Sequence, residues 1–197
     1  EDIAVLYRTN LNPRLLVERL MEYNIPFTMK DSLPNLYEHW ICRNILAYIN
    51  AARGNLKRGN ILQIINRPNR YISRDALEEA DVSWNKVKSF YQDKGWMVER
   101  VEQLEYDLVM LREMPPAAAV NYIRKAIGYD DYLKEYAQIR SMKAEELLET
   151  ADQLKESAAG FKTMEDWFGQ MEECKKRLRR FINQFNAERT LGRTKNV

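Results

Sequence analysis

The chain has 197 residues, of which 45% are hydrophobic and 30% are charged, and its net charge is +2. This is ordinary composition for a soluble protein, and no run approaches the roughly 18 apolar residues of a membrane helix. Only 7 glycines and 6 prolines argue against a turn-rich β fold, and the 2 cysteines, far apart and outside any CxxC, indicate a reducing, cytoplasmic protein.

The small net charge hides two strongly positive segments. From Arg53 to Arg74 there are six basic residues and no acidic one, and from Met171 to Lys195 there are eight basic and three acidic residues. The remainder of the chain is therefore acidic. Because local patches rather than the total charge decide phosphate binding, these two segments are the first candidates for contact with a polyanion.

The first 30 residues predict a strand, a turn, a helix and a second extended segment. Ile3 to Tyr7 is a short apolar run typical of a buried strand. Asn12 and Pro13 form a helix start, since Asn can cap and Pro suits the first helical position. Phe27 to Met29 restarts an extended segment after Pro26 has ended the helix.

The rest of the chain is predicted to be helical because apolar residues recur at steps of three and four. Ser73, Ser83, Asp130 with Asp131, and Thr163 are predicted caps. The predicted fold class is mainly α, a multi-helix accessory domain with a small β element at the N-terminus. The predicted helices cover residues 36–52, 59–65, 74–79, 84–93, 97–113, 117–127, 132–138, 143–158 and 163–187.

No motif for independent catalysis is present in the sequence. There is no GxxxxGK[ST] sequence to cradle a triphosphate and no acidic pair after a hydrophobic strand. The only histidine, His39, lies three residues before Cys42, which predicts a surface or packing pair rather than a nucleophile with its base. One histidine and two cysteines supply no evident zinc site, so no metal site is predicted.

The N-terminal segment Ala4–Asn10, which reads AVLYRTN, resembles one family closely. UvrD/Rep/PcrA-type superfamily 1 DNA helicases carry a similar segment where their second RecA-like motor domain, 2A, resumes. Tyr7, Arg8, Thr9, Asn10 and Arg14 match it in place, as does the later run from Ile25 to Phe27. In that family the segment leads into a helical insertion called 2B.

The resemblance implies three parts and a role for each. Residues 1–50 would be a partial RecA-like motor domain, residues 51–190 the helical insertion, and residues 191–197 the return to the motor. Arg8 and Asn10 would lie on the single-strand DNA track of the motor, although on the residues alone they could simply close a strand-to-helix turn. The ATP and Mg²⁺ motifs of the parent helicase would lie outside this excised piece, which is expected to hold no cofactor and to be inactive alone.

The segment Asn66–Arg74 is the main candidate for duplex binding. Lying between two short helices, it can aim backbone N–H groups at a phosphate, and Arg67, Arg70 and Arg74 add charge. Relatives have "NTPxRGIGxxT" here; Pro68 and Arg70 match, whereas Tyr71 and Ser73 replace the glycines, which argues against close backbone approach. The predicted DNA-binding residues are Arg8, Asn10, Arg67, Asn69, Arg70, Tyr71, Ser73 and Arg74, and the alternative for this segment is a solvated basic turn.

A second basic patch is predicted on the last helix. Lys175, Lys176, Arg179 and Arg180 lie above an apolar face, and the alternative is again a plain solvated surface. The tryptophans are predicted to be core residues rather than a base-stacking platform, because they are isolated from one another; they are Trp40, Trp84, Trp96 and Trp167.

The resemblance implies a DNA-binding regulatory region of an ATP-dependent 3′→5′ DNA helicase, with a role in DNA repair. It would contact duplex near a single-strand/double-strand junction and the other domains of the same helicase, without a membrane. Two alternatives stay open. The insertion could dock protein partners and touch DNA little, as the acidic remainder and the lost glycines favour, or the parent could be a helicase–nuclease subunit.

Overall fold

The computed structural model describes residues 3–7, 16, 17, 19, 20, 23, 25, 27 and 35–193, with side chains as far as Arg180. Internal contacts divide the chain into one unit of Trp40–Trp167 and another of Glu1–His39 with Phe168–Val197. The predicted division at residues 50 and 190 stays a prediction, although α2 runs across the first of these positions.

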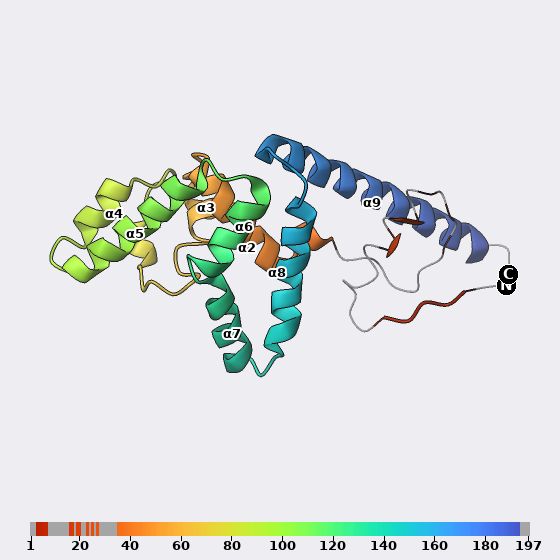
Figure 1. Ribbon diagram of the computed structural model, residues 1–197, viewed down its shortest axis with the longest axis horizontal. Coiled ribbons are helices and arrows are strands. Elements are labelled where there is room, and N and C mark those ends of the chain that lie inside the picture. The colour runs from red at the N-terminus through yellow and green to blue at the C-terminus, as the bar shows by residue number, and fades with distance from the viewer. Residues whose placement is uncertain are drawn as a thin grey trace. The chain divides into compact units, whose positions relative to one another are not determined.

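The described residues are mainly helical, which confirms the predicted fold class. Most observed helices lie within a few residues of the predicted ranges (Figure 1). The α-helices are α2 (Trp40–Ala52), α3 (Arg58–Ile61), α4 (Trp84–Phe90), α5 (Gly95–Leu111), α6 (Pro116–Lys125), α7 (Tyr129–Ile139), α8 (Ala144–Ala158) and α9 (Met164–Arg193), and two short 3₁₀ helices are η1 (Leu36–Glu38) and η2 (Arg74–Ala76). None of the described helices is both long enough and apolar enough to span a membrane.

The predicted N-terminal strand is not formed. Ile3 to Tyr7 belong to no ladder, and the side chains of Ile3 and Leu6 are 90% and 96% exposed. A strand becomes stable only when a neighbouring strand accepts and donates its backbone hydrogen bonds, and the described residues offer no such neighbour. The helix predicted after Pro13 is observed at its described positions, such as Leu16 and Leu20.

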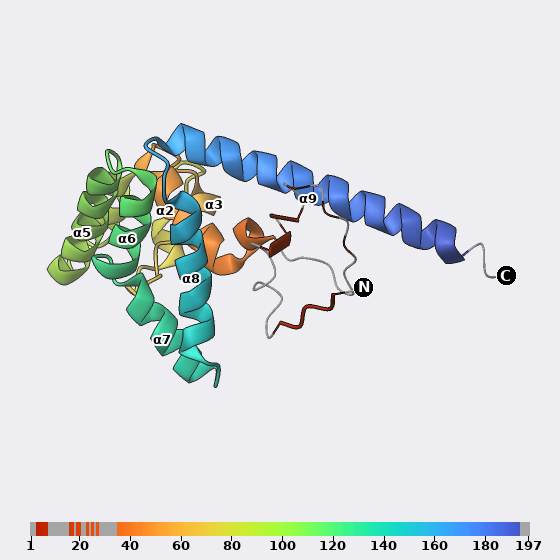
Figure 2. The same cartoon turned by 45° about the vertical axis from the view of Figure 1, so that its right-hand side comes forward.

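Helix α2 is the centre of the Trp40–Trp167 unit. Its apolar residues recur at helical spacing, so Ile41, Ile45, Tyr48 and Ile49 are all buried. It contacts α3, α5, α6 and α8, and Figure 2 shows α6 and α8 beside it. Burial of these side chains and of Trp167, which is 0% exposed, forms the core.

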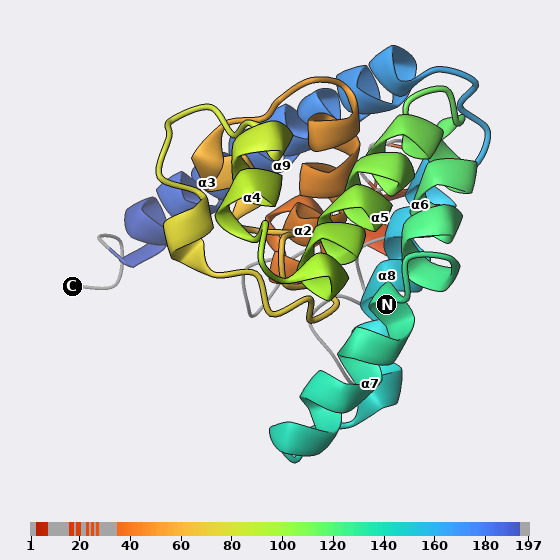
Figure 3. The same ribbon diagram turned by 90° about the vertical axis from the view of Figure 1, so that its left-hand side faces the viewer.

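Two helical hairpins flank this centre. Helices α4 and α5 contact each other, as do α7 and α8, and Figure 3 shows both pairs. The glycine at the start of α7 has φ of +87°, a left-handed conformation that residues with a side chain rarely adopt. Gly128 occupies the N-cap position directly before α7, and the predicted caps Asp130 and Asp131 instead lie in the first turn of the helix.

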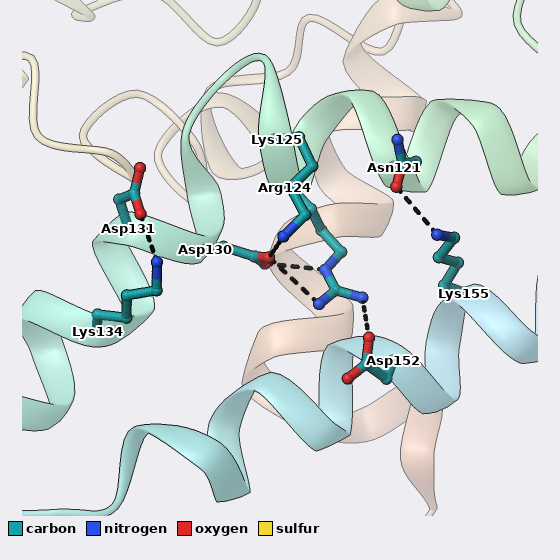
Figure 4. A network of polar contacts seen from close by, with 8 residues as sticks. All are labelled: Asn121, Arg124, Lys125, Asp130, Asp131, Lys134, Asp152 and Lys155. Atoms are coloured by element: carbon teal, nitrogen blue, oxygen red, sulfur yellow. Dashed lines mark hydrogen bonds and ion pairs between the residues drawn. The ribbon is translucent and has the colours of Figure 1, made fainter.

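Asp130 does not cap α7 because its carboxylate binds cations of α6 (Figure 4). The Arg124 Nε and Nη2 donate to its two oxygens at 2.9 and 3.3 Å, and the Lys125 Nζ lies 2.8 Å away. The Arg124 Nη1 donates to Asp152 of α8 at 2.6 Å. The side chains of Arg124 and Asp130 are 6% and 4% exposed, whereas those of Asp152 and Lys125 are 58% and 64% exposed. A buried ion pair with two exposed partners therefore joins α6, α7 and α8.

Candidate nucleic-acid interface

The segment between α3 and η2 is held in shape by one amide side chain. The Asn66 Oδ1 accepts the backbone N–H groups of Arg70 at 3.3 Å and Ile72 at 3.0 Å. Its Nδ2 donates to the carbonyl of Ile72 at 2.8 Å. Asn66 thereby satisfies three backbone groups that no regular secondary structure would satisfy here, and the turn from Asn66 to Ser73 is preorganised.

Arg70 points into the protein. It is only 7% exposed, and its Nη1 donates to the carbonyls of Ile64, Ile65 and Pro68 at 3.2 to 3.4 Å. Its guanidinium lies over the Tyr48 ring, 5.9 Å from the centroid. Arg70 was predicted to contact DNA, but its Nη1 closes the turn by joining these three carbonyls.

Arg67 also faces the body of the unit. Its Nη1 donates to the Asn44 Oδ1 at 2.9 Å and to the Gln63 carbonyl at 3.0 Å. The Asn44 Nδ2 in turn donates to the Tyr129 hydroxyl at 2.9 Å, and the Tyr48 hydroxyl donates to the Arg67 carbonyl at 2.8 Å. These bonds tie the turn to α2 and α7.

Three of the predicted residues remain on the surface of the turn. Asn69, Tyr71 and Arg74 are exposed, and Ser73 is half-buried. The Asn69 Oδ1 accepts the backbone N–H of Tyr71 at 3.1 Å, which is an Asx turn. The Ser73 Oγ accepts the N–H of Asp75 at 3.2 Å and caps η2 as predicted.

Tyr71 has an unfavourable backbone conformation. Its φ is +59°, in the left-handed region where a residue with a Cβ costs roughly 1–2 kcal/mol more than in the right-handed one. The ring is 67% exposed, so burial of the ring offsets little of this cost.

A guanidinium lies over two exposed aromatic rings beside the turn. The Arg100 Cζ is 5.4 Å from the centroid of Tyr71 and 4.9 Å from that of Trp96, and its Nη1 donates to the Arg70 carbonyl at 3.2 Å. Trp96 is 53% exposed. The prediction that Trp96 is a core residue is therefore wrong. Trp96 lies in the first turn of α5, and its ring contacts the half-buried Arg100.

Buried charges beneath the turn compensate each other. Burial raises the pKa of Asp107, although hydrogen bonds from Gln103 and Tyr122 and the charge of Arg70 oppose this rise. Burial also raises the pKa of Tyr48, which keeps its hydroxyl protonated as the donor to Arg67. At the surface, Arg74 of the turn and Lys94 before α5 are exposed and Arg100 is half-buried, while the carboxylates of Asp75 and Glu99 are exposed beside them in the sequence.

The second basic patch is partly neutralised by its own helix. Lys175 pairs with Glu172 at 2.6 Å and Arg177 with Glu173 at 3.6 Å. Lys176, Arg179 and Arg180 are exposed, so a reduced patch remains on α9. Arg8 and Asn10, the predicted motor-track residues, lie outside the described residues.

No metal centre is evident in the part of the chain that the structure describes, since no three His, Cys, Asp or Glu side chains converge there. Sequence reasoning missed Asn66 and Arg100 as site residues. The spacing of Trp96 and Arg100 is a signal that could have found one of them, because residues four apart on a helix meet and this pair suits a cation–π contact.

Comparisons with known proteins place this geometry in context. The sequence profile described as the UvrD-like helicase C-terminal domain matches residues 1–195. The chain is 27% identical over 186 residues to the putative ATP-dependent DNA helicase YjcD of Bacillus subtilis, covering 89% of the chain and 24% of YjcD. It is 30% identical over 79 residues to ATP-dependent DNA helicase PcrA of Staphylococcus aureus, and 32% over 78 residues to PcrA of Staphylococcus epidermidis, covering 40% of the chain and 11% of each relative. The chain thus spans about a quarter or less of these relatives.

Proposed function

Since the chain belongs to the UvrD-like helicase C-terminal domain family, we propose that it is a DNA-binding accessory region of an ATP-dependent DNA helicase. It contacts duplex DNA next to a single-strand/double-strand junction through the turn Asn66–Arg74. Residues 51–190 form the accessory 2B insertion, and Arg8 and Asn10 belong to the motor's single-strand track. Its orientation regulates unwinding by the motor of the parent protein.

One observation carries this proposal: the turn is preorganised and presents an exposed arginine, Arg74, and an exposed amide, Asn69. Asn66, Arg67 and Arg70 use their side chains to fix the backbone, while Asn69 and Arg74 stay exposed. A rigid turn that presents a guanidinium and an amide can bind phosphates without first ordering its own chain, which lowers the entropic cost of binding.

ATP and Mg²⁺, which the family resemblance implies for the parent, have no fitting site among the described residues. The sequence lacks GxxxxGK[ST], and no acidic cluster of the described part could hold a metal. When bound to the parent, ATP would supply the energy for translocation. The residues of this chain contribute binding and orientation, and no nucleotide chemistry is assigned to them.

A protein-docking role is the second candidate function. Arg67 and Arg70 face inward, so the turn offers less charge than its sequence indicates. The α7–α8 hairpin carries two exposed apolar residues at its tip, Ile139 at 80% and Met142 at 47%. An apolar tip of this kind suits a protein partner better than a polyanion.

Replacing Arg74 with alanine should weaken binding of the 197-residue chain to a forked duplex. One lost phosphate contact should reduce the slope of log Kd against log salt by about 1 and leave stability unchanged. Fluorescence anisotropy at two salt concentrations measures both. Arg140→Ala is the matched control, because Arg140 is an exposed arginine at the end of α7.

The control should bind like the wild type. Equal loss in both variants would indicate only a general charge effect, and weak, equal binding by wild type and Arg74→Ala would contradict duplex binding through the turn. In the second case, weaker binding of the Ile139→Asp variant to other helicase domains would favour the docking role.

A further inference from the structure

We infer that the surface formed by Tyr71, Arg100 and Trp96 stacks an unpaired nucleobase at the junction. This inference rests on the proposed function and adds a ligand to it: a single exposed base next to the duplex, in addition to the duplex phosphates. The occupant is assigned from the arrangement of the three side chains and from the charge of the turn that carries Tyr71.

The first step is that one face of the Tyr71 ring already has a planar partner. The Arg100 guanidinium lies over this ring and over Trp96, and its position is fixed by the hydrogen bond to the Arg70 carbonyl. Arg100 thus contacts both rings. Because Tyr71 is 67% exposed, its ring has area left for a further flat group, and every base offers a π-face.

The second step concerns the backbone. Tyr71 keeps φ at +59°, a conformation that glycine would adopt without strain, yet the side chain there is large and mostly in solvent. Strain of this kind that is not offset by burial points to a role for the ring itself. Fixed in this way, the ring loses little freedom when a base stacks on it.

The third step explains why a nucleobase fits this surface better than a protein partner does. The chain from Arg53 to Arg74 contains no acidic residue, and the exposed neighbours of Tyr71 within the turn are Asn69 and Arg74. A patch of two aromatic rings with polar and cationic neighbours is small for a protein interface. It suits an aromatic ligand that carries a phosphate, and this is a nucleotide of single-stranded DNA.

The test uses two forked duplexes that differ at one position. The first has 2-aminopurine as the first unpaired nucleotide, and the second has an abasic site there. Wild-type protein should bind the first about tenfold more tightly, the size expected for one base–aromatic stack, and should quench the 2-aminopurine fluorescence. Tyr71→Phe should keep both effects.

Tyr71→Gly is the decisive variant. Glycine relieves the backbone strain, so the variant should unfold at the same or a higher urea concentration than wild type, yet the preference for the base over the abasic site should disappear. A residue with a purely structural role would not lose this preference. Tyr106→Ala is the matched control, because Tyr106 is a 56% exposed tyrosine of α5 outside the stack, and it should keep the preference.

The inference is overturned if wild type binds both forks equally or if Tyr71→Gly keeps the preference. Its failure can be told apart from failure of the proposed function. If Arg74→Ala loses affinity for a blunt duplex while the wild type shows no preference for the base, the proposal of duplex binding is kept and that of base stacking is rejected. Absence of binding to every DNA would reject both.

Discussion

Replacing Asp130 with asparagine should lower the free energy of unfolding by about 1.5–3 kcal/mol, because it removes the buried counter-ion of Arg124 and leaves this guanidinium with the exposed carboxylate of Asp152. The Arg124 side chain is 6% exposed and donates two hydrogen bonds to Asp130. Asparagine has nearly the same shape but offers one neutral acceptor. Urea denaturation of both proteins at pH 7 measures the difference.

Asp131→Asn is the control, since it removes the neighbouring carboxylate under the same conditions. Asp131 is 75% exposed and pairs with Lys134 one helical turn away. Such surface pairs contribute little, so the variant should stay within about 0.5 kcal/mol of wild type. A loss in Asp131→Asn as large as in Asp130→Asn would show that the burial of the network does not matter.

The same network predicts that the protein loses stability as the solution becomes acidic. Burial alone would raise the pKa of Asp130, but the hydrogen bonds and charges of Arg124 and Lys125 outweigh it and lower the pKa below its usual 3.8. The stabilisation is therefore present above about pH 4 and is lost as the pH falls through the lowered value. Asp107 has the opposite sign, because its pKa is raised. When the pH falls from about 5 to about 2, the range in which such a carboxylate titrates, the free energy of unfolding of Asp130→Asn should fall less than that of the wild type.

Replacing Arg70 with alanine should destabilise the protein by about 2–4 kcal/mol and also weaken DNA binding. The lost hydrogen bonds come from a charged donor, and they leave the carbonyls of Ile64, Ile65 and Pro68 buried without this partner. The turn then loses its shape, so the contacts of Arg74 weaken indirectly. Urea denaturation and anisotropy, both on the same preparation, separate the two effects.

Arg74→Ala provides the contrast, since it should reduce affinity and leave stability unchanged. Arg70→Lys should regain only part of the stability, because one ammonium group does not have the reach of a guanidinium fork. If Arg70→Ala is as stable as the wild type, Arg70 does not hold the turn together, and the prediction that it contacts DNA directly is favoured. A triple alanine variant of Arg67, Arg70 and Arg74 cannot distinguish these roles, since two of its three positions hold the turn together.

The helices could be predicted because their signals are local. Apolar spacing in α2 and α5, Pro116 at the start of α6, and the Thr163–Asp166 capping box are all read within one or two turns. The strand at Ile3–Tyr7 could not be predicted in the same way, because a strand depends on a partner elsewhere in space. Asp130 was misjudged as a cap for the same reason: Arg124 competes for its carboxylate.

The sequence singles out the candidate turn, but it does not reveal which of the turn's arginines face solvent. The basic segment without acids and the match around Pro68 and Arg70 drew attention to this turn, and DNA binding by it stays a prediction. Which arginine faces solvent depends on buried carbonyls and on Tyr48, and these contacts appear only after folding. The stack of Tyr71 on Arg100 joins residues 29 positions apart, so no local spacing reveals it.

The most direct test of DNA binding by this turn is a residue-by-residue map of the contact surface. Backbone amide NMR shifts of the 197-residue chain would be followed while a forked duplex is added. Our account predicts that the largest changes occur at residues 69–74 and 96–100. Silent amides in both segments, with changes instead at the α7–α8 tip or at residues 175–180, would contradict it.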